Sequence, residues 1–359
     1  MITRRGFIKQ LSAGGLLAGM PDFLFSQKGT FSKEMIWANL LHLSYNMWTD
    51  HPYVVWDDKP ADFYAAKDFE PVTCMDARRW ARGYRPFLTF DYSTWTAILD
   101  HTVKAGMNMV VIDLGDAVKY ESHPEIAVEN AWSTTQLKNE LARIRNMGLE
   151  PIPKLNFATS HHSWLGEYSR MVSTQKYYTV CRNLIREVCD LFDKPRFFHL
   201  GMDEERVRYF NQYLYMVIRQ GELWWHDFYI FVDEVERQGS RPWIWSDYVW
   251  NAPEMFFRKM PNTVLQSNWY YGTDFGPEVT AVKYYEELDK HGYDQIPTGS
   301  NHSNPVNFEK TVGYCKQVID PSRLHGFMTA PWRPTLAPCL ETHKAAVDQV
   351  AAGIRKYLK

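Results

Sequence analysis

The chain has 359 residues, a formal net charge of -2 and 15% aromatic residues. This length is enough for one large barrel or for two ordinary domains. With a net charge near zero the chain has no excess of positive charge, so binding of nucleic acid is not expected. The 14 Trp and 21 Tyr residues have flat apolar faces with a polar edge, which suit stacking on sugar rings and also suit a large core.

The N-terminus carries an export pattern. The twin arginine Arg4-Arg5 is followed by an aromatic residue, a lysine and a mildly apolar stretch over residues 11–20, which resembles a twin-arginine export signal. The stretch is too short and too rich in glycine for a stable membrane span. We therefore expect residues 1–30 to be this signal with a short linker, read by the twin-arginine export machinery, and the protein to be periplasmic or secreted without a stable membrane anchor. The alternative is a disordered basic tail.

The cysteines are five, an odd number, and no two of them are spaced as CxxC. The sequence therefore signals neither a zinc site nor a disulfide framework. Proteins that use this export route fold before they cross, in a reducing cytosol, so we expect mostly free, buried thiols. We predict no cofactor and no metal.

Beyond residue 30 the chain repeats one pattern. A short apolar run and a loop are followed by an amphipathic helix, as in parallel βαβ units. The expected strands are residues 35–43, 109–114, 150–156, 196–201, 242–247, 263–269, 294–299 and 324–330. The expected helices are residues 92–105, 134–147, 176–192, 222–238, 253–259, 279–290, 306–318 and 340–358. Eight such units over residues 31–359 predict a single-domain α/β fold, the (β/α)8 TIM barrel.

An open, doubly wound sheet is the alternative fold, but no GxGxxG or P-loop pattern follows any expected strand, which weakens its nucleotide-binding version. Glycines such as Gly148 and Gly239 stand just past the expected helix ends, where a left-handed residue is favoured. The long segment 49–91, rich in aromatic residues and arginine, is expected to cover part of the barrel mouth.

The most informative residues follow the fourth expected strand, where Asp203 and Glu204 are adjacent. Two like charges a few Å apart cannot both ionise freely, so one pKa is raised, and a carboxyl that stays protonated near neutral pH can act as a general acid. We expect a raised pKa for Glu204, which lies beside Asp203 in a partly desolvated mouth. Gly201 would let the chain turn so that both carboxylates face one cavity. The alternative is a surface Asp-Glu pair that opens the next helix, where acids suit the helix dipole.

In such a barrel the functional residues gather at the carboxyl ends of the strands. Carboxylates, amides and indoles recur there, which is the mixture that sugars need, because planar rings meet their CH faces and polar groups meet their hydroxyls. The candidate sugar-binding residues are Asp113, Asn156, His161, Trp245, Asp247, Trp269, Tyr270 and Trp332.

Some of these residues also have structural interpretations. Asp113 is expected to be a buried acceptor for loop amides rather than a catalyst. Lys154, inside the third expected strand, could enter the barrel and pair with Asp113 or with Asp203. Because Trp243 and Trp245 alternate along one strand, one of them is expected to face the helices.

Residues 191–204, with the sequence LFDKPRFFHLGMDE, resemble the fourth-strand signature His-x-Gly-Gly-Asp-Glu of the family 20 glycoside hydrolases, the β-N-acetylhexosaminidases. Met202 replaces the second glycine of that signature. Weaker similarity extends to residues 242–247, 264–269 and 326–332, which resemble the fifth, sixth and eighth strands of the family.

The resemblance implies roles for the acid pair. Glu204 would be the general acid/base, and Asp203 would hold and polarise a 2-acetamido group of the substrate, which itself attacks the anomeric carbon. Such an enzyme retains the anomeric configuration and needs no nucleophile from the protein. Trp245, Trp269 and Trp332 would form the walls of the subsite that grips the sugar.

The chain departs from the family at three strand ends. It has no arginine after the first strand and no tyrosine after the seventh, and Arg333 follows Trp332 where the family has a glutamate. Either the substrate differs or the activity has been lost. The alternatives are therefore a conventional retaining glycosidase with Asp247 or Asp113 as nucleophile, and a non-catalytic carbohydrate-binding barrel. A fourth hypothesis is a metal-dependent sugar isomerase or lyase that uses His161, His162 and the acid pair.

Overall fold

The structure is a computed structural model, and it describes residues 34–53, 62–66 and 69–357. The export signal expected at residues 1–30 lies outside the described residues. From Met35 onward the chain forms one compact unit. Among the helices that the structure describes, none combines the length and the apolar character needed to cross a bilayer.

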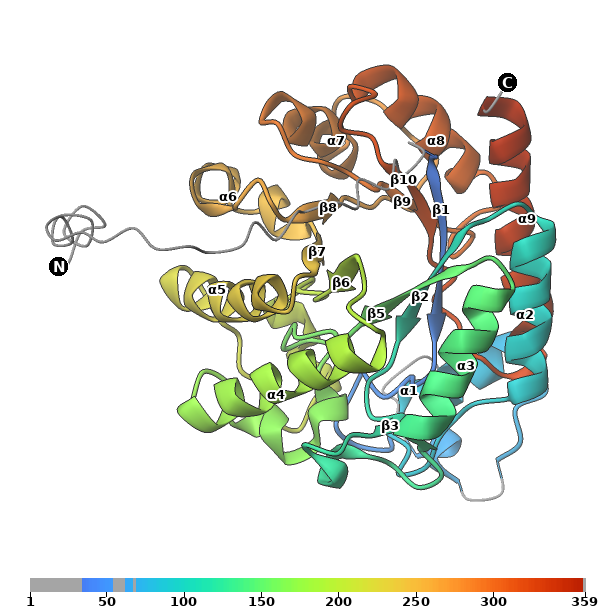
Figure 1. Cartoon of the computed structure of the whole chain (residues 1–359), viewed down its shortest axis with the longest axis vertical. Coiled ribbons are helices and arrows are strands. Elements are labelled where there is room, and N and C mark those ends of the chain that lie inside the picture. Colours follow the sequence, from blue (N-terminus) through green and yellow to red (C-terminus); the bar gives the residue numbers. More distant parts are fainter. Residues whose placement is uncertain (1–33, 54–61, 67–68, 358–359) are drawn as a thin grey trace, which may run out of the picture. The chain divides into compact units, whose positions relative to one another are not determined.

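Eight parallel strands form the centre of this unit (Figure 1). Their spatial order is β8-β7-β6-β5-β2-β1-β10-β9, and the bridges Gln266–Gln295 and Trp269–Thr298 join the two ends of the sheet into a barrel. All eight expected strands are present, so the predicted fold class is confirmed. The strands are β1 (Ile36–His42), β2 (Met109–Asp113), β5 (Glu150–Lys154), β6 (Phe197–His199), β7 (Arg241–Trp245), β8 (Leu265–Ser267), β9 (Thr298–Gly299) and β10 (Gly326–Thr329).

The eight expected helices are also present, and they surround the strands (Figure 1). Gly148 and Gly239 have φ of +84° and +83°, which confirms the left-handed residues expected past two helix ends. The helices are α2 (Tyr92–Lys104), α3 (Thr134–Asn146), α4 (Gln175–Leu191), α5 (Glu222–Arg237), α6 (Pro253–Lys259), α7 (Thr280–Lys290), α8 (Asn307–Val318) and α9 (Leu340–Tyr357).

The sequence analysis missed several short elements in the loops. Helix α1 (Cys74–Arg82) begins with a capping box in which Thr73 and Asp76 bond reciprocally, a signal that was visible in the sequence. The other missed elements are a two-stranded sheet of β3 (Val118–Lys119) and β4 (Trp132–Ser133), and the 3₁₀ helices η1 (Phe63–Ala65), η2 (Pro124–Ile126), η3 (Ser163–Arg170), η4 (Val207–Gln212), η5 (Asp247–Trp250) and η6 (Ala337–Cys339).

The barrel interior is filled by one apolar cluster that draws its residues from seven of the eight strands, from Ile296 just before β9 and from no helix. Trp243 and Trp245 both belong to it, whereas Ile244 between them packs in the layer outside the strands. The expectation that one tryptophan faces the helices is therefore wrong, because residues two apart in a strand share a face.

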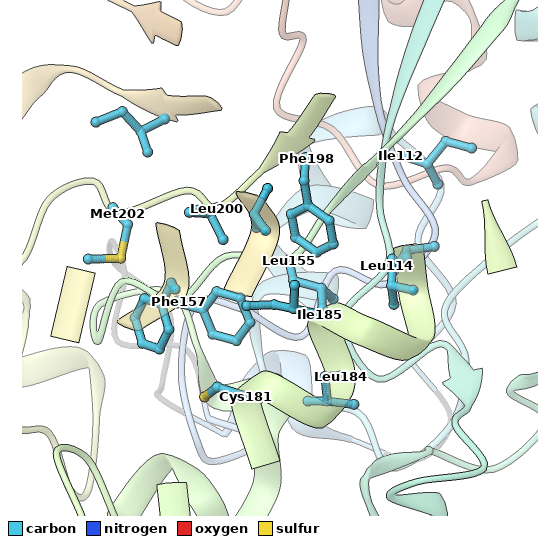
Figure 2. Close-up of a cluster of buried hydrophobic side chains, with 14 of the residues drawn as sticks. Ile112, Leu114, Leu155, Phe157, Cys181, Leu184, Ile185, Phe198, Leu200 and Met202 are labelled. Carbon is cyan, nitrogen blue, oxygen red and sulfur yellow. The ribbon is translucent and has the colours of Figure 1, made fainter. Parts of the chain in front are cut away.

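The layer outside the strands fixes the segment that leads to the acid pair. Figure 2 shows Phe198, Leu200 and Met202 among the side chains that pack with Leu184 and Ile185 of α4. These residues are buried, so burial against α4 sets the face on which each residue of this segment lies. The side chains at alternate positions are thereby turned toward the barrel axis.

Part of the segment 49–91 lies over the carboxyl ends of the strands, as expected. The guanidinium of Arg82, at the end of α1, lies 4.2 Å from the centroid of the Trp48 ring. Arg78 Nη2 lies 2.8 Å from His302 Nε2, which follows β9. Helix α1 therefore joins residues from two separate strand ends.

Candidate active site

The chain turns sharply between β6 and the acid pair. Gly201 has φ of +70°, and a Cβ there would lie 2.0 Å from Asn156 Oδ1, so glycine is required for both conformation and space. Met202 and Glu204 also have positive φ, of +72° and +57°. Backbone strain of this kind persists where the surroundings enforce it, often at functional sites. Met202 thus has a backbone conformation that favours glycine, while its side chain is buried in the core.

Asp203 and Glu204 face a single imidazole. His161 Nε2 lies 3.5 Å from Asp203 Oδ2 and 3.4 Å from Glu204 Oε2. Asn156 donates Nδ2 to Asp203 Oδ1 at 2.9 Å and accepts the backbone N–H of Met202 on its Oδ1 at 3.2 Å. Two residues that follow β5 therefore hold the acid pair that follows β6.

The pKa values of Asp203 and Glu204 are shifted in opposite directions. Burial raises the pKa of Asp203, and the charge of Glu204 acts in the same direction, against the charge of His161. Burial would also raise the pKa of Glu204, but the hydrogen bond and charge of His161, with Tyr209 and Arg208, lower it to about 2. The expected raised pKa of Glu204 is therefore wrong, because the argument from its neighbour alone left out three groups that favour the ionised form.

Two of those groups come from η4. Arg208 Nη2 donates to Glu204 Oε1 at 2.7 Å and to the Tyr209 hydroxyl at 2.6 Å. The Arg208 side chain is 57% exposed, whereas that of Glu204 is 14% exposed. The exposed side of the Glu204 carboxylate is thus covered by the long, largely exposed side chain of Arg208, which a ligand could displace.

The loop that carries η4 is anchored by a buried ion cluster. Arg219 pairs with Glu205, and its Nη1 lies 3.1 Å from Asp227 Oδ2 on α5. Both arginine and Asp227 are buried, so breaking either pair would leave an uncompensated charge. This anchor holds the two ends of the loop while η4 lies between them at the surface.

Asp247 is a third carboxyl beside the pair. Its Oδ2 accepts the backbone N–H of Glu204 at 3.1 Å and Arg206 Nη2 at 3.2 Å. Burial, together with the charges of Asp203 and Glu204, raises its pKa to about 7 against the charge of Arg206. Its Oδ1 is buried and has no hydrogen-bond partner among the described residues. Asp247 also lines a cavity of about 360 Å³, together with Glu204, Arg206, Trp224, Tyr248 and Asn251.

Asp113, the last residue of β2, is buried at the carboxyl end of its strand. It forms an ion pair with Lys154 on the neighbouring strand β5, and His42 Nδ1 lies 3.4 Å from its Oδ2. Burial would raise the pKa of Asp113, but the charges and hydrogen bonds of Lys154 and His42 lower it. Lys154 thus pairs with Asp113, and the partners of this buried carboxylate are Lys154 and His42 rather than the loop amides that were expected.

Aromatic rings form a wall at the strand ends. Trp332, which has φ of +53°, has its ring centroid 5.8 Å from that of Trp245 and 6.0 Å from that of Trp48. Its Nε1 donates to the Tyr271 hydroxyl at 2.8 Å, and the Tyr271 ring stacks on Trp269 at 5.1 Å. The three predicted tryptophans are therefore brought together.

Tyr270 does not belong to this wall. Its ring packs edge-on against Phe275 at 5.3 Å, in the cluster formed with α8 and α9 outside the strands. Tyr271 instead occupies the mouth, and the charges of Asp203, Glu204 and Asp247 act on its hydroxyl. The sequence held a signal for this. Tyr271 is two residues after Trp269, so in extended chain their side chains lie on the same face, whereas the side chain of Tyr270 lies on the opposite face.

The same site contains a trio of side chains with metal-ligand chemistry. Ligand atoms of His161, Asp203 and Glu204 lie within 4.8 Å of one another, which is the one such group found in the part of the chain that the structure describes. His162 is not a member. Its pKa is lowered to about 3 by burial and by the charge of Arg219, so the fourth hypothesis would have to rest on His161 alone.

No protein-family model matches the chain, and no curated protein does. Solved structures, however, resemble it. A β-N-acetylhexosaminidase from Bacteroides fragilis is 14% identical, with 88% of this chain and 65% of that protein covered and a TM-score of 0.52. A family 20 exo-β-N-acetylglucosaminidase from Vibrio harveyi, in complex with N-acetylglucosamine, is 14% identical, with 75% and 56% covered and a TM-score of 0.51. The pneumococcal virulence factor StrH is 11% identical, with 90% and 84% covered and a TM-score of 0.55.

The chain has the fold of the family 20 glycoside hydrolases. At these identities the similarity establishes the fold and not the reaction. The chain also spans only 65% of the length of the Bacteroides protein and 56% of that of the Vibrio protein. The function is therefore argued from the side chains of the site.

Proposed function

We propose that this protein is a retaining glycoside hydrolase that acts on an oligosaccharide or glycoconjugate containing a 2-acetamido sugar. The observation that carries the proposal is the carboxylate pair Asp203–Glu204, held by one imidazole at the carboxyl end of a barrel strand. The motif in residues 191–204 and the hexosaminidase fold support the same substrate class. An aromatic wall beside the pair offers the flat apolar surface on which a sugar ring stacks.

Asp203 is proposed to receive the N–H of the 2-acetamido group and to turn its carbonyl oxygen toward the anomeric carbon. That oxygen attacks the anomeric carbon, and the C–O bond to the leaving group breaks. Asn156 and His161 fix the Asp203 carboxyl, so it needs little reorganisation when positive charge develops on the acetamido group. Fixed groups of this kind stabilise the transition state more than the bound substrate.

Glu204 is proposed to give a proton to the leaving-group oxygen and later to take one from the attacking water. This role requires a protonated carboxyl, whereas the pKa of Glu204 is lowered to about 2. Arg208 holds the exposed side of Glu204, where a leaving group must bind. We infer that the substrate displaces Arg208 and excludes water, and both changes raise the pKa of Glu204.

Asp247 is proposed to bind a hydroxyl of the substrate. Its Oδ1 is a buried acceptor for which the described part of the chain supplies no donor, and an unsatisfied buried acceptor is costly unless a ligand or water supplies one. The cavity that it shares with Glu204 measures about 360 Å³. A sugar unit next to the cleaved bond could therefore reach both residues.

The test is a panel of aryl glycosides assayed at several pH values with wild-type protein and Glu204→Gln. Turnover of a 2-acetamido glycoside with a poor leaving group should fall by about 100-fold or more in the variant, because it loses the proton donor. Glu254→Gln, an exposed position on α6, is the matched control and should behave as wild type. Undiminished turnover in Glu204→Gln would remove Glu204 from the mechanism.

One observation favours a second candidate, the conventional retaining scheme. The pKa of Asp247 is raised to about 7 and that of Glu204 is lowered to about 2, so Asp247 retains a large protonated fraction near neutral pH while Glu204 is ionised. In this scheme Asp247 is the acid and Glu204 the nucleophile, the reverse of the roles expected from sequence. A 2-fluoro sugar that becomes covalently attached to Glu204 would establish it.

Two further outcomes separate the remaining hypotheses. Binding of oligosaccharides without turnover of any glycoside would support a non-catalytic carbohydrate-binding barrel. Activity that disappears with a chelator and returns with a divalent cation would support a metal held by His161, Asp203 and Glu204.

A further inference from the structure

Two cysteines that are far apart in sequence meet at the edge of the barrel mouth. Cys74 is the first residue of α1, and Cys339 is the last residue of η6. Cys339 Sγ lies 3.5 Å from the backbone oxygen of Cys74, and the side chain of Cys339 is the largest influence on the Cys74 thiol. Cys339 is fully buried, whereas Cys74 is partly exposed.

The surroundings of the pair distinguish the two sulfurs. The hydrogen bond from Cys339 is the main reason that the pKa of Cys74 falls to about 6, against the effect of burial, and Thr342 and Arg333 act in the same direction. The same contact and burial raise the pKa of Cys339. Cys74 thus combines partial exposure with thiolate character, which is what a reactive cysteine requires. Cys339 is a shielded thiol in contact with it.

We propose that Cys74 and Cys339 are a redox-active pair that closes to a disulfide in the presence of a small-molecule disulfide such as oxidised glutathione. The Cys74 thiolate attacks one sulfur of the oxidant, forms a mixed disulfide and releases one glutathione thiolate. Cys339 then loses its proton and attacks Cys74 Sγ, which releases the second glutathione. Two protein thiols are oxidised to one disulfide, and one glutathione disulfide is reduced to two thiols that take up the two protons.

The bond would act on the cover of the barrel mouth. Helix α1 carries Arg82, which lies over Trp48, and Arg78, which contacts His302. A disulfide would tie the first turn of α1 to the start of α9, which η6 precedes directly. It would close a loop of more than two hundred residues, the kind of long loop for which a cross-link restricts the unfolded chain most. This proposal is independent of the proposed hydrolase activity.

The experiment uses the full chain, purified in reductant and then treated with oxidised glutathione. All five cysteines are free in the structure, so the number of titratable thiols under denaturing conditions should fall by two. The intact mass should fall by two hydrogens, and peptide mapping should recover one cross-linked peptide that contains Cys74 and Cys339. The rate should rise with pH through about pH 6, where Cys74 ionises, and the melting temperature should rise and return to its starting value after reduction.

Serine variants provide the controls. Cys74→Ser and Cys339→Ser should each abolish the cross-link, whereas Cys315→Ser, at a buried thiol elsewhere, should still lose two thiols. Because Cys74 is partly exposed whereas Cys339 is buried, the Cys74→Ser variant should fold even if the Cys339→Ser variant does not. A stable glutathione adduct on Cys74 without the cross-linked peptide, or no loss of thiols in the folded protein, would overturn the proposal.

Discussion

Arg208 offers the most direct way to test how the charge of Glu204 is set. Its Nη2 donates to Glu204 Oε1 at 2.7 Å, and its positive charge is one of the effects that lower the pKa of Glu204 to about 2. We expect Arg208→Gln to raise that pKa, because the variant removes the cation and leaves His161 and Tyr209 in place.

The size of the shift follows from geometry and exposure. An adjacent arginine lowers the pKa of a carboxyl by about 1 to 3 units. Arg208 is 57% exposed, and it lowers the pKa of Glu204 less than His161 and Tyr209 do. Solvent screening should therefore limit the contribution of Arg208 to about one pKa unit or less. The change should be smaller at high ionic strength, where such a pair is screened.

The assay is carbon NMR of protein labelled at glutamate carboxyls, with the Glu204 signal assigned from Glu204→Gln. Over the pH range in which both proteins remain folded, protonation of Glu204 should begin at higher pH in Arg208→Gln than in wild type. Arg186→Gln is the matched control, since Arg186 is 54% exposed and lies 3.4 Å from the buried Glu234. An unchanged or lowered pKa of Glu204 in Arg208→Gln would refute the reasoning.

Three other predictions concern the turn, the third carboxyl and export. Gly201→Ala should unfold at a clearly lower denaturant concentration than the control Gly239→Ala. Both glycines have positive φ, but of the two only Gly201 has atoms within 4 Å of a new Cβ. Equal unfolding midpoints for the two variants would contradict the steric argument. Asp247 has a folded-state pKa raised from 3.8 to about 7, so the folded protein binds the extra proton and its stability falls as pH rises through this window. Asp247→Asn should therefore lose less stability between about pH 4 and pH 7 in urea titrations, and an unchanged loss would argue against the raised pKa. Replacing Arg4 and Arg5 with Lys should leave the precursor in the cytosol, and normal export in cell fractionation would remove the twin-arginine interpretation.

The elements of the barrel were accessible from sequence because each depends on local information. Periodic apolar residues and glycines past helix ends placed eight strands and eight helices, and the same alternation explains why Tyr271 rather than Tyr270 reaches the mouth. Gly201 was expected to turn the chain, and its φ of +70° confirms it. Helix α1 was missed although its capping box was visible, because its nine residues include three arginines and an aspartate and lie within a long loop.

The electrostatics of the site could not be predicted in the same way. The pKa of Glu204 depends on His161, which follows a different strand, and on Arg208 and Tyr209, which lie in a loop without periodic pattern. Adjacent acids in the sequence indicate repulsion, but only the fold shows which cations and donors offset it. The contact between Cys74 and Cys339 is equally hidden, because two elements far apart in the chain create it.

We propose that a 2-acetamido glycoside is hydrolysed with retention through the pair Asp203–Glu204. The most direct measurement is proton NMR of the sugar released from a β-linked 2-acetamido aryl glycoside, recorded before the anomers equilibrate. We expect the β anomer to appear first and Glu204→Gln to release it far more slowly. First appearance of the α anomer, or turnover of the same glycoside at an unchanged rate by Glu204→Gln, would contradict it.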